Sequence, residues 1–200
     1  MRYTGPVCRL CRREGEKLFL KGEKCTSQKC PLMKKNYAPG QTAGKSSFKK
    51  QSEYGRQLRN KQKAKRIYGI TEKQFRRYYD MSTKQEGITG DNLLKMLEQR
   101  LDNVVYRASF ADSRSQARQF VGHGLVRLNG KKATTSSQLI KLGDKVSMKN
   151  AEKVEKRKDG SPKWLKVDMK KGEAEVTFLP EKDDTESSVD SQMIVEFYSK

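Results

Sequence analysis

The 200-residue sequence has few acidic residues, few apolar residues, a single histidine and no long hydrophobic run. A stretch of about 18 apolar residues is missing, which argues against a membrane-spanning helix. The start, Met1-Arg2-Tyr3, is not followed by the apolar segment of a secretory signal, so we expect an intracellular, cytoplasmic protein. Because only 34% of the residues are apolar, any hydrophobic core must be modest and divided among small units.

The chain has a strong positive charge because basic residues outnumber acidic ones. Lys and Arg number 44 against 24 Asp and Glu, for a net charge of +20. This balance indicates a polyanionic partner, with nucleic acid the first candidate and an anionic membrane surface the second. Residues 1–70 hold 19 basic and 4 acidic side chains, and residues 101–150 hold 9 and 3. These two segments should therefore carry the basic surface.

All four cysteines lie within the first thirty residues. Two residues separate Cys8 from Cys11, four separate Cys25 from Cys30, and thirteen lie between the pairs. This spacing is typical of structural zinc sites, in which four thiolates leave no position open for a catalytic water. Two disulfides or four unliganded thiols are the alternatives, although a reducing cytosol disfavours disulfides. Basic residues around the cysteines should offset the charge of a zinc centre and present a positive surface: Arg9, Arg12, Arg13, Lys17, Lys21, Lys24 and Lys29.

The segment EYGRQLRNKQKAKRIY, residues 53–68, predicts a helix with very little apolar surface. Such a run of cations is often only a solvated face. Six cations without an acid after Glu53 nevertheless favour a face that contacts phosphates. The six are Arg56, Arg59, Lys61, Lys63, Lys65 and Arg66.

Two further helices should follow. Thr71 and Gln74 form a capping box, and the helix that begins there carries Phe75, Tyr78 and Tyr79 on one side. These rings could stack on bases, but at helical spacing core packing is the better interpretation. A second helix is predicted from near residue 91 through LLKMLEQRLDNVVYR, anchored by a stripe of Leu93, Leu94, Leu97, Leu101, Val104 and Val105.

Residues 109–132 predict a helix followed by a tight hairpin. The helix should begin at the capping box of Ser113 and Gln116 and end at Gly122 or Gly124. Arg114 and Arg118 lie four apart and share a face, which we expect to oppose the apolar one. The apolar face consists of Ala117, Phe120 and Val121.

In the hairpin, Asn129 and Gly130 supply the positive φ angles of a two-residue turn, and Lys131 and Lys132 follow at once. Together with the helix arginines they predict a compact cationic platform. Dispersed cations of this kind fit RNA, recognised through phosphates and 2′-hydroxyls, better than the DNA major groove. A small α+β unit with a merely solvated basic face is the alternative.

The remaining segments predict loops and strands. Residues 31–52 and 151–163 read as loops. Three strands are predicted at WLKVD, AEVTFLP and MIVEFY, with the acidic stretch EKDDTESSVDS as an exposed connection. Their expected core residues are Trp164, Val167, Val176, Phe178, Ile194 and Phe197.

Ten short segments are distributed along nearly the whole chain: GPVCRLCRREG, LKGEKC, PGQ, EYGRQLRNKQKAKRIYGI, EKQFR, ITG, LEQRLDNVVYR, SRSQARQFVGHG, LNGK and IVEFYSK. With them the chain closely resembles the family of bacterial small-subunit ribosomal protein number four, in its zinc-binding form. The resemblance implies an α+β fold: a helical N-terminal domain with a zinc-stapled extension, plus an inserted α/β domain with an antiparallel sheet that carries the αL RNA-binding motif. The implied boundaries are 1–45 for the zinc-binding basic extension, 46–93 for the helical rRNA-binding domain, 94–180 for the αL domain and 181–200 for the C-terminal segment.

The resemblance also implies a function. The family is a structural constituent of the small ribosomal subunit and a primary binder of the 16S rRNA 5′ domain that nucleates assembly of the body. It contacts the neighbouring fifth protein, lies beside the mRNA entry path and supports translational accuracy, and its cofactor is a structural Zn²⁺. The residues that match the αL motif are Arg107, Ser113, Arg114, Gln116, Ala117, Arg118, His123, Gly124, Asn129, Gly130 and Lys131. Thr42, Ser115 and Gly122 depart from the family's pattern, and each departure removes a possible phosphate contact.

A catalytic function is not expected, because the sequence has neither a nucleophile paired with a histidine nor a Gly-rich phosphate loop. A free-standing RNA chaperone with an αL domain is the alternative binding function. Such a protein should bind structured RNA weakly and promiscuously, and tRNA should displace it from rRNA.

Overall fold

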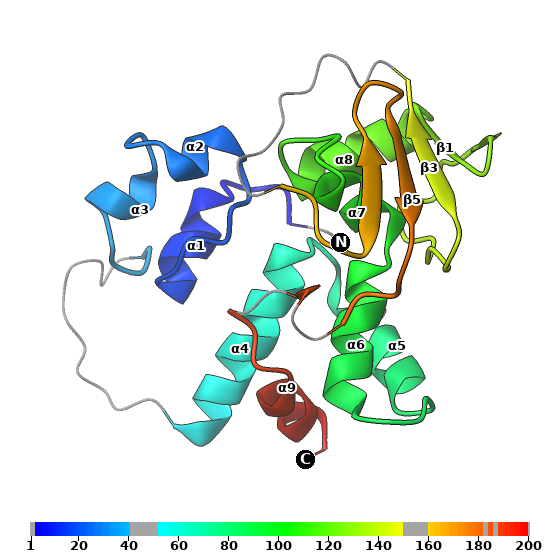
Figure 1. Ribbon diagram of the computed structural model, residues 1–200. Helices are drawn as coiled ribbons and strands as arrows, with labels where there is room; N and C mark the ends of the chain where they lie inside the picture. Colours follow the sequence, from blue (N-terminus) through cyan, green and yellow to red (C-terminus); the bar gives the residue numbers. More distant parts are fainter. Residues whose placement is uncertain (1–2, 41–51, 150–159, 182–183, 186–187, 200) are drawn as a thin grey trace. The chain divides into compact units, whose positions relative to one another are not determined.

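The computed structural model describes residues 3–40, 52–149, 160–181, 184–185 and 188–199 (Figure 1). The chain divides into two compact units: residues 1–77 together with 188–200 form the first, and residues 78–187 form the second. The second unit is therefore an insertion into the first. Among the residues described, none of the helices combines the length and the apolar character that crossing a bilayer requires.

Helices make up the described part of the first unit. Three short ones, α1 (Cys8–Glu14), α2 (Glu23–Thr26) and α3 (Pro31–Lys34), precede the long α4 (Glu53–Ile67), which confirms the predicted basic helix. Ser52 caps α4 by accepting a hydrogen bond from the backbone N–H of Gly55. Next comes α5 (Glu72–Ser82), which contains the boundary between the units, and the C-terminal α9 (Ser191–Tyr198) packs against α4.

The C-terminal segment MIVEFY is helical, so its prediction as a strand is wrong. Asp190 caps the helix, because its carboxylate accepts hydrogen bonds from the backbone N–H groups of Gln192 (2.9 Å) and Met193 (3.3 Å). Ile194 is fully buried, and the Phe197 ring lies against Tyr54 of α4. A short apolar run fits either a strand or a buried helix, and here the N-cap decides between them.

The second unit combines helices with a five-stranded antiparallel sheet. The helices are α6 (Thr89–Glu98), α7 (Leu101–Arg107) and α8 (Arg114–Gly122). The strands are β1 (Val126–Leu128), β2 (Lys131–Lys132), β3 (Lys145–Met148), β4 (Leu165–Asp168) and β5 (Glu173–Val176), in the order β2-β1-β3-β5-β4. Alternate strand residues face inward, so Val126, Val146 and Val176 share one core with Phe110 and Trp164.

The long helix predicted from near residue 91 is two helices, α6 and α7, broken at Arg100. Arg100 has an extended backbone (φ −65°, ψ 137°) and forms an isolated β-bridge with Leu139. The backbone N–H of Leu101 then donates to the carbonyl of Gln138 at 2.8 Å. This pairing with a distant segment replaces helical hydrogen bonds at the break. All six residues of the predicted apolar stripe are nonetheless buried.

Most side chains predicted to be core are core. Phe75, Tyr78 and Tyr79 of α5 are buried, which confirms packing rather than base stacking. Phe178 is 68% exposed, so its prediction as core is wrong. It lies beyond the end of β5, where the inward and outward alternation of the strand no longer applies.

The predicted loops lie partly outside the described residues. Residues 41–51, 150–159, 182–183 and 186–187 are not described, and they include Thr42, most of the loop predicted at 151–163 and part of the acidic connection. Within the loop predicted at 31–52, the first four residues form α3, so the prediction is wrong there. Pro31 at the first helical position favours this start.

Candidate nucleic-acid interface

Both ends of α8 are fixed by its own sequence. The Ser113 hydroxyl accepts a hydrogen bond from the backbone N–H of Gln116 at 3.3 Å, which confirms this capping interaction. The Gln116 side-chain oxygen accepts one from the backbone N–H of Asp112 at 2.7 Å, so this predicted RNA ligand stabilises its own helix. At the other end, Gly124 has φ +69° and closes the helix in a Schellman arrangement.

The two arginines of α8 lie on its packed side, which corrects the prediction that their face opposes the apolar one. Arg114, Ala117 and Val121 are all buried, and Arg118 completes the same i, i+3, i+4, i+7 stripe. The exposed positions of α8 and its C-cap hold no Lys, Arg, Asp or Glu: they are Ser115, Gln119, Gly122 and His123.

Asp102 of α7 holds two arginines. Its carboxylate accepts hydrogen bonds from Arg100 Nε (3.1 Å) and Nη2 (2.9 Å), and from Arg118 Nε (2.8 Å) and Nη2. Asp102 and Arg100 are almost completely buried, whereas the Arg118 side chain keeps 17% of its surface exposed. Burial alone would lower the pKa of Arg100, but the Asp102 carboxylate raises that pKa above its ordinary value.

Glu98, at the end of α6, holds Arg107 in the same way. Its buried carboxylate accepts hydrogen bonds from Arg107 Nε (2.9 Å) and Nη2 (2.7 Å) and from Asn103 Nδ2 (2.7 Å). The Asn103 side-chain oxygen accepts one from Arg114 Nε at 2.8 Å, and the Arg114 guanidinium lies 4.4 Å from the ring centre of Tyr106. We call these two clusters of side chains the arginine network: Asp102 with Arg100 and Arg118, and Glu98 with Arg107, Asn103 and Arg114.

The turn between β1 and β2 has the predicted geometry. Asn129 has φ +50° and Gly130 has φ +78°, and the turn joins the strands through two residues. The Asn129 side chain donates to Asp144 Oδ1 at 2.8 Å and accepts from the backbone N–H of Lys145 at 2.9 Å. This predicted RNA ligand therefore also has a structural role, since it ties the turn to the start of β3.

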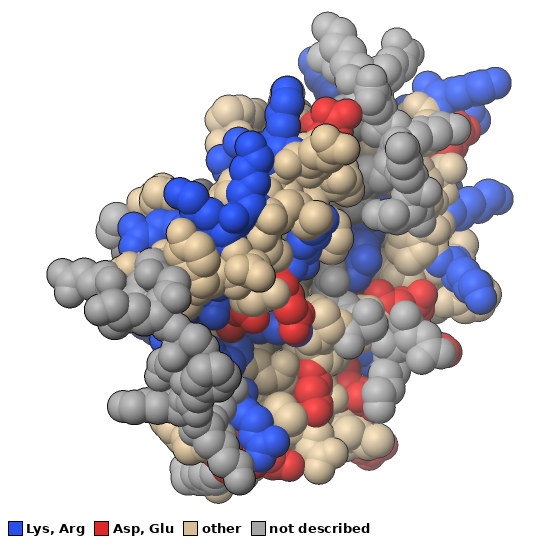
Figure 2. Space-filling view, turned by 90° about the vertical axis from the view of Figure 1, so that its left-hand side faces the viewer, with Lys and Arg blue, Asp and Glu red and all other residues tan. Residues whose placement is uncertain are grey.

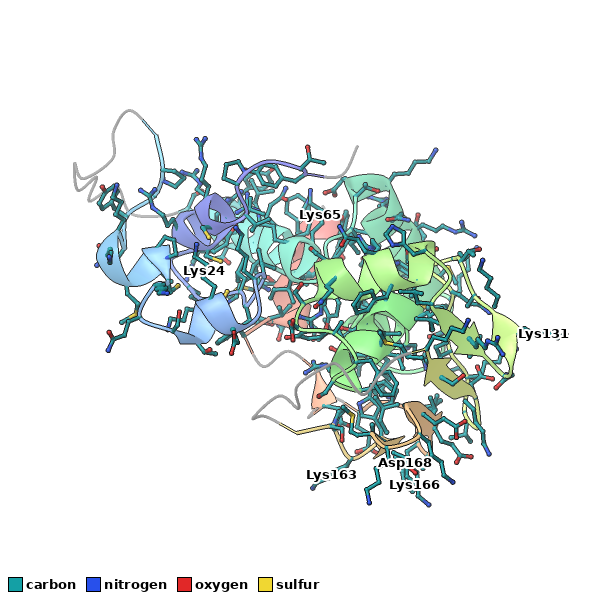
Figure 3. The ribbon with its side chains drawn as sticks, turned by 90° about the horizontal axis from the view of Figure 1, so that it is seen from above. Lys24, Lys65, Lys131, Lys163, Lys166 and Asp168 are labelled. Carbon is teal, nitrogen blue, oxygen red and sulfur yellow. The ribbon has the colours of Figure 1, made fainter. Side chains whose placement is uncertain are left out.

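The hairpin presents exposed cations beside the end of α8. Arg127, Lys131 and Lys132 are exposed, and Figure 3 shows Lys131 at the outer end of the hairpin. Lys132 lies across Gly124, because a Cβ atom at Gly124 would come within 1.9 Å of Lys132 Cε. The glycine thus lets the lysine lie close to the C-terminus of α8, where a positive charge is favourable.

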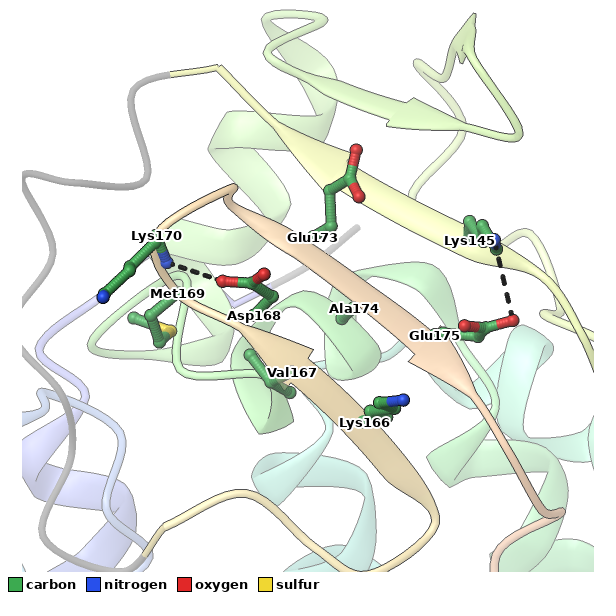
Figure 4. A pocket seen from close by; sticks show the side chains of 9 residues that line it. All are labelled: Lys145, Lys166, Val167, Asp168, Met169, Lys170, Glu173, Ala174 and Glu175. Atoms are coloured by element: carbon green, nitrogen blue, oxygen red, sulfur yellow. Dashed lines mark hydrogen bonds and ion pairs between the residues drawn. The ribbon is translucent and has the colours of Figure 1, made fainter.

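The outer face of the sheet differs in charge. A hollow over β3, β5 and β4 is lined by three lysines and three carboxylates. Lys145 Nζ lies 3.8 Å from Glu175 Oε1, an ion pair that is drawn in Figure 4. Lys166 and Asp168 lie close together on β4 (Figure 3). Because the opposite charges balance, this hollow offers a polyanion little net attraction.

Each of the six cations of α4 has a carboxylate partner, which was not predicted from the sequence. Lys and Arg side chains spread over one face of the molecule with Asp and Glu set among them (Figure 2). The pairs are Arg59 and Arg66 with Glu14, Lys63 with Glu16, Arg56 with Glu53, and Lys61 and Lys65 with Glu72. The predicted phosphate-contacting face is therefore ion-paired within the chain rather than a bare row of cations.

Glu72 connects α4, α5 and α9. It accepts hydrogen bonds from Lys61 Nζ (2.8 Å), Lys65 Nζ (3.0 Å) and the Tyr198 hydroxyl (2.7 Å). Burial alone would raise the pKa of Glu72, but these hydrogen bonds lower it to about 2. The Lys61 side chain is only 6% exposed, and its Nζ lies 4.4 Å from the ring centre of Phe197.

The four cysteines lie on or beside the first three helices: Cys8 and Cys11 in α1, Cys25 in α2 and Cys30 before α3. None forms a disulfide, and all but Cys8 are buried. Burial raises the pKa of Cys11 and Cys25, and charges on the other thiols act in the same direction, so the four sulfurs share one neighbourhood. Among the described residues, however, no group of three or more His, Cys, Asp or Glu side chains is arranged to hold a metal ion. The donor set fits Zn²⁺ in its chemistry, and the side chains would have to close around the ion.

The arginines beside the cysteines differ in their contacts. Arg9 and Arg13 are exposed, as a nucleic-acid surface requires. Arg12 instead donates to the carbonyl of Tyr37 at 3.1 Å and lies 4.8 Å from the centre of its ring.

The acidic residues that hold the arginines were not predicted either. Asp102 stands inside the apolar stripe of RLDNVVYR, and Glu98 precedes it by one helical turn. The sequence signal that could have revealed these pairs is a carboxylate at a core position, because a buried negative charge requires a cationic partner.

Comparison with known proteins gives two family matches along the chain. Residues 2–98 match the family described as the ribosomal protein S4/S9 N-terminal domain, and residues 99–146 match the S4 domain. The chain is 50% identical over 208 residues to the small ribosomal subunit protein uS4 of Halothermothrix orenii, with 100% of this chain and 99% of the relative covered. Proteins named uS4 from Acetivibrio thermocellus and uS4A from Alkaliphilus oremlandii are also 50% identical, over 208 and 207 residues, with the same coverage. The chain therefore belongs to the small ribosomal subunit protein uS4 family.

Proposed function

We propose that this chain is a non-enzymatic structural protein of the small ribosomal subunit in the cytoplasm, and that it binds ribosomal RNA. The observation that carries the proposal is the S4 domain itself. There, three exposed cations of the β1–β2 hairpin stand beside the end of α8, and Arg107 and Arg118 reach the surface from a rigid interior network.

The finer assignment is to the 5′ domain of 16S rRNA. Early binding there would nucleate assembly of the body, with further contacts to the neighbouring fifth protein and to mRNA near its entry path, and with an influence on decoding accuracy. Membership of the uS4 family supports this assignment, and so does the strong positive charge of residues 1–70.

The proposed RNA contacts are mainly to phosphates. Dispersed lysines and arginines that reach the surface at fixed positions recognise the shape of a folded RNA rather than its bases. The exposed Lys and Arg residues of the predicted set are Arg9, Arg13, Arg56, Lys131 and Lys132. Some predicted residues, such as Lys61, have partners inside the chain. They would contribute to RNA binding indirectly, because they hold the surface of the protein in shape.

The test is binding of the full chain to a transcript of the 16S rRNA 5′ domain, with salt titration and with tRNA as competitor. Removal of one phosphate-neutralising side chain should reduce the log–log salt slope by about 0.9. The variant Lys131→Ala/Lys132→Ala should weaken binding and lower the slope, whereas Lys166→Ala, in the charge-balanced hollow, should change binding little. Displacement of the chain by tRNA would indicate an RNA chaperone instead.

A structural zinc ion is part of the proposal. Cys8, Cys11, Cys25 and Cys30 would hold it, and four thiolate ligands would join the first three helices without supplying any reactive position. The gathering of four unpaired thiols, three of them buried, supports this. Zinc content of the purified chain, measured before and after Cys25→Ser, tests it; a metal-free wild type that remains folded would contradict it.

A further inference from the structure

Two buried carboxylates in the second unit account for the positions of four arginines. Asp102 accepts hydrogen bonds from Arg100 and Arg118, and Glu98 from Arg107 directly and from Asn103, which holds Arg114. The arginines come from the start of α7, the end of α7 and two turns of α8. Each carboxylate therefore fixes the positions of long side chains that would otherwise be flexible.

The two arginines that bind Asp102 differ in how deeply they are buried. Arg100 is 1% exposed and cannot reach a ligand, whereas the Arg118 side chain is 17% exposed and borders solvent. The bonds to Asp102 come from Arg118 Nε and Nη2, which constrains the plane of the guanidinium. A constrained arginine loses less side-chain entropy when it binds a phosphate.

If only its charge mattered, Asp102 would weaken RNA binding rather than support it. An aspartate next to a phosphate-binding surface repels RNA, so its neutralisation should strengthen binding. If the main effect of Asp102 is to orient Arg118, neutralisation should weaken binding even though the protein becomes more positive. The two effects have opposite signs, which makes them separable.

We propose that Asp102 is a positioning residue for RNA binding: it holds the Arg118 guanidinium in the orientation that meets a backbone phosphate. The inference rests on the proposed function. It adds an acidic residue, buried and out of reach of RNA, to the set that determines affinity for it.

The experiment measures binding of the full chain to the 16S rRNA 5′-domain transcript for Asp102→Asn, with Asp168→Asn as the matched control. Asp168 is an exposed aspartate on the charge-balanced outer face of the same unit. Asp102→Asn should weaken binding about three- to tenfold, the effect of freeing one long side chain, and should lower the salt slope. Asp168→Asn should bind as tightly as the wild type or more tightly. A folded Asp102→Asn protein that binds as tightly as Asp168→Asn would overturn the inference.

A double-mutant cycle with Arg118→Ala separates positioning from general destabilisation. If Asp102 acts through Arg118, Asp102→Asn should have little further effect on binding once Arg118 is gone. Equal losses of affinity in both backgrounds would show a merely structural role and overturn the inference. Trp164 fluorescence and far-UV circular dichroism identify folded samples.

A third variant keeps the inference testable if Asp102→Asn does not fold. Arg118→Lys preserves the charge but cannot form the two-nitrogen contact with Asp102. It should also weaken binding several-fold, and unchanged affinity would overturn the inference. Failure of the wild type itself to prefer its rRNA over an unrelated duplex would instead refute the proposed function.

Discussion

Replacement of Glu72 by glutamine should destabilise the first unit, and the reason is the lysine that Glu72 neutralises. Lys61 is nearly buried, with its ammonium group between the Glu72 carboxylate and the aromatic rings of α9. Glu72→Gln keeps the shape of the side chain and removes the charge. A buried ammonium group would then lack its counter-charge, which is the costly way to break such a pair.

The size of the effect follows from the pKa of Glu72. Its fall from 4.5 to about 2 sets an upper limit of roughly 3.4 kcal/mol at 1.36 kcal/mol per pKa unit. The Glu72 side chain is 46% exposed, however, so water screens much of this interaction. We therefore expect Glu72→Gln to lower the free energy of unfolding of the first unit by about 1–2 kcal/mol.

The pH dependence has a definite sign. The folded-state pKa of Glu72 lies below its ordinary value, so the stabilisation is present above about pH 4.5 and is lost as the pH falls toward about 2. The difference in stability between the wild type and Glu72→Gln should accordingly shrink over this range.

Native-state hydrogen exchange of α4 peptides measures the effect, and peptides from β3 and β5 in the second unit serve as the internal control. In a Lys61→Met background the cost of Glu72→Gln should fall by about 1 kcal/mol, because no buried ammonium group remains. The reasoning is refuted if Glu72→Gln leaves α4 protection unchanged, or if its cost is the same with and without Lys61.

Three further predictions concern separate parts of the chain. Chelation of the proposed zinc ion should disorder residues 1–30 and leave the second unit folded; limited proteolysis tests this, and loss of the whole fold would contradict it. Gly124→Ala should destabilise the second unit by about 1 kcal/mol or more, because the φ angle of Gly124 is positive. Gly122 lies inside α8 with open space around it, so Gly122→Ala should stabilise the unit by about 0.5–1 kcal/mol. Thermal unfolding followed by Trp164 fluorescence compares the two variants. In urea unfolding, Phe110→Ala should cost about 3–5 kcal/mol because the ring is fully buried, while Phe178→Ala should lie within about 0.5 kcal/mol of wild type; similar values for both would show that Phe110 does not anchor the core.

Local rules predicted much of the fold from the sequence. The capping positions Thr71 and Ser113 start helices, and the Asn129-Gly130 turn joins two strands, because each depends on residues only a few positions apart. The break at Arg100 could not be predicted in this way. The break depends on the pairing of Arg100 with Leu139, which is far along the chain. The helical periodicity of residues 91–107 does not indicate such a distant partner.

The candidate site was harder to predict, because arginine side chains on a helix are ordinarily exposed, whereas here they are packed inward. Arg114 and Arg118 occupy the same helical stripe as Ala117 and Val121, and the spacing alone assigns all four to one face. Arginines in such a stripe face inward only if the protein supplies partners for them. Asp102 binds Arg118 and Asn103 binds Arg114, and both partners stand on α7, so only the folded structure reveals the pairing.

The discontinuous first unit has a consequence for the order in which the nascent protein matures. Ile194 and Tyr198, which complete the contacts of α4 and α5, are translated after all of residues 78–187. Since domains fold as units, the inserted unit can fold without α9, whereas the first unit cannot be completed until α9 has been synthesised.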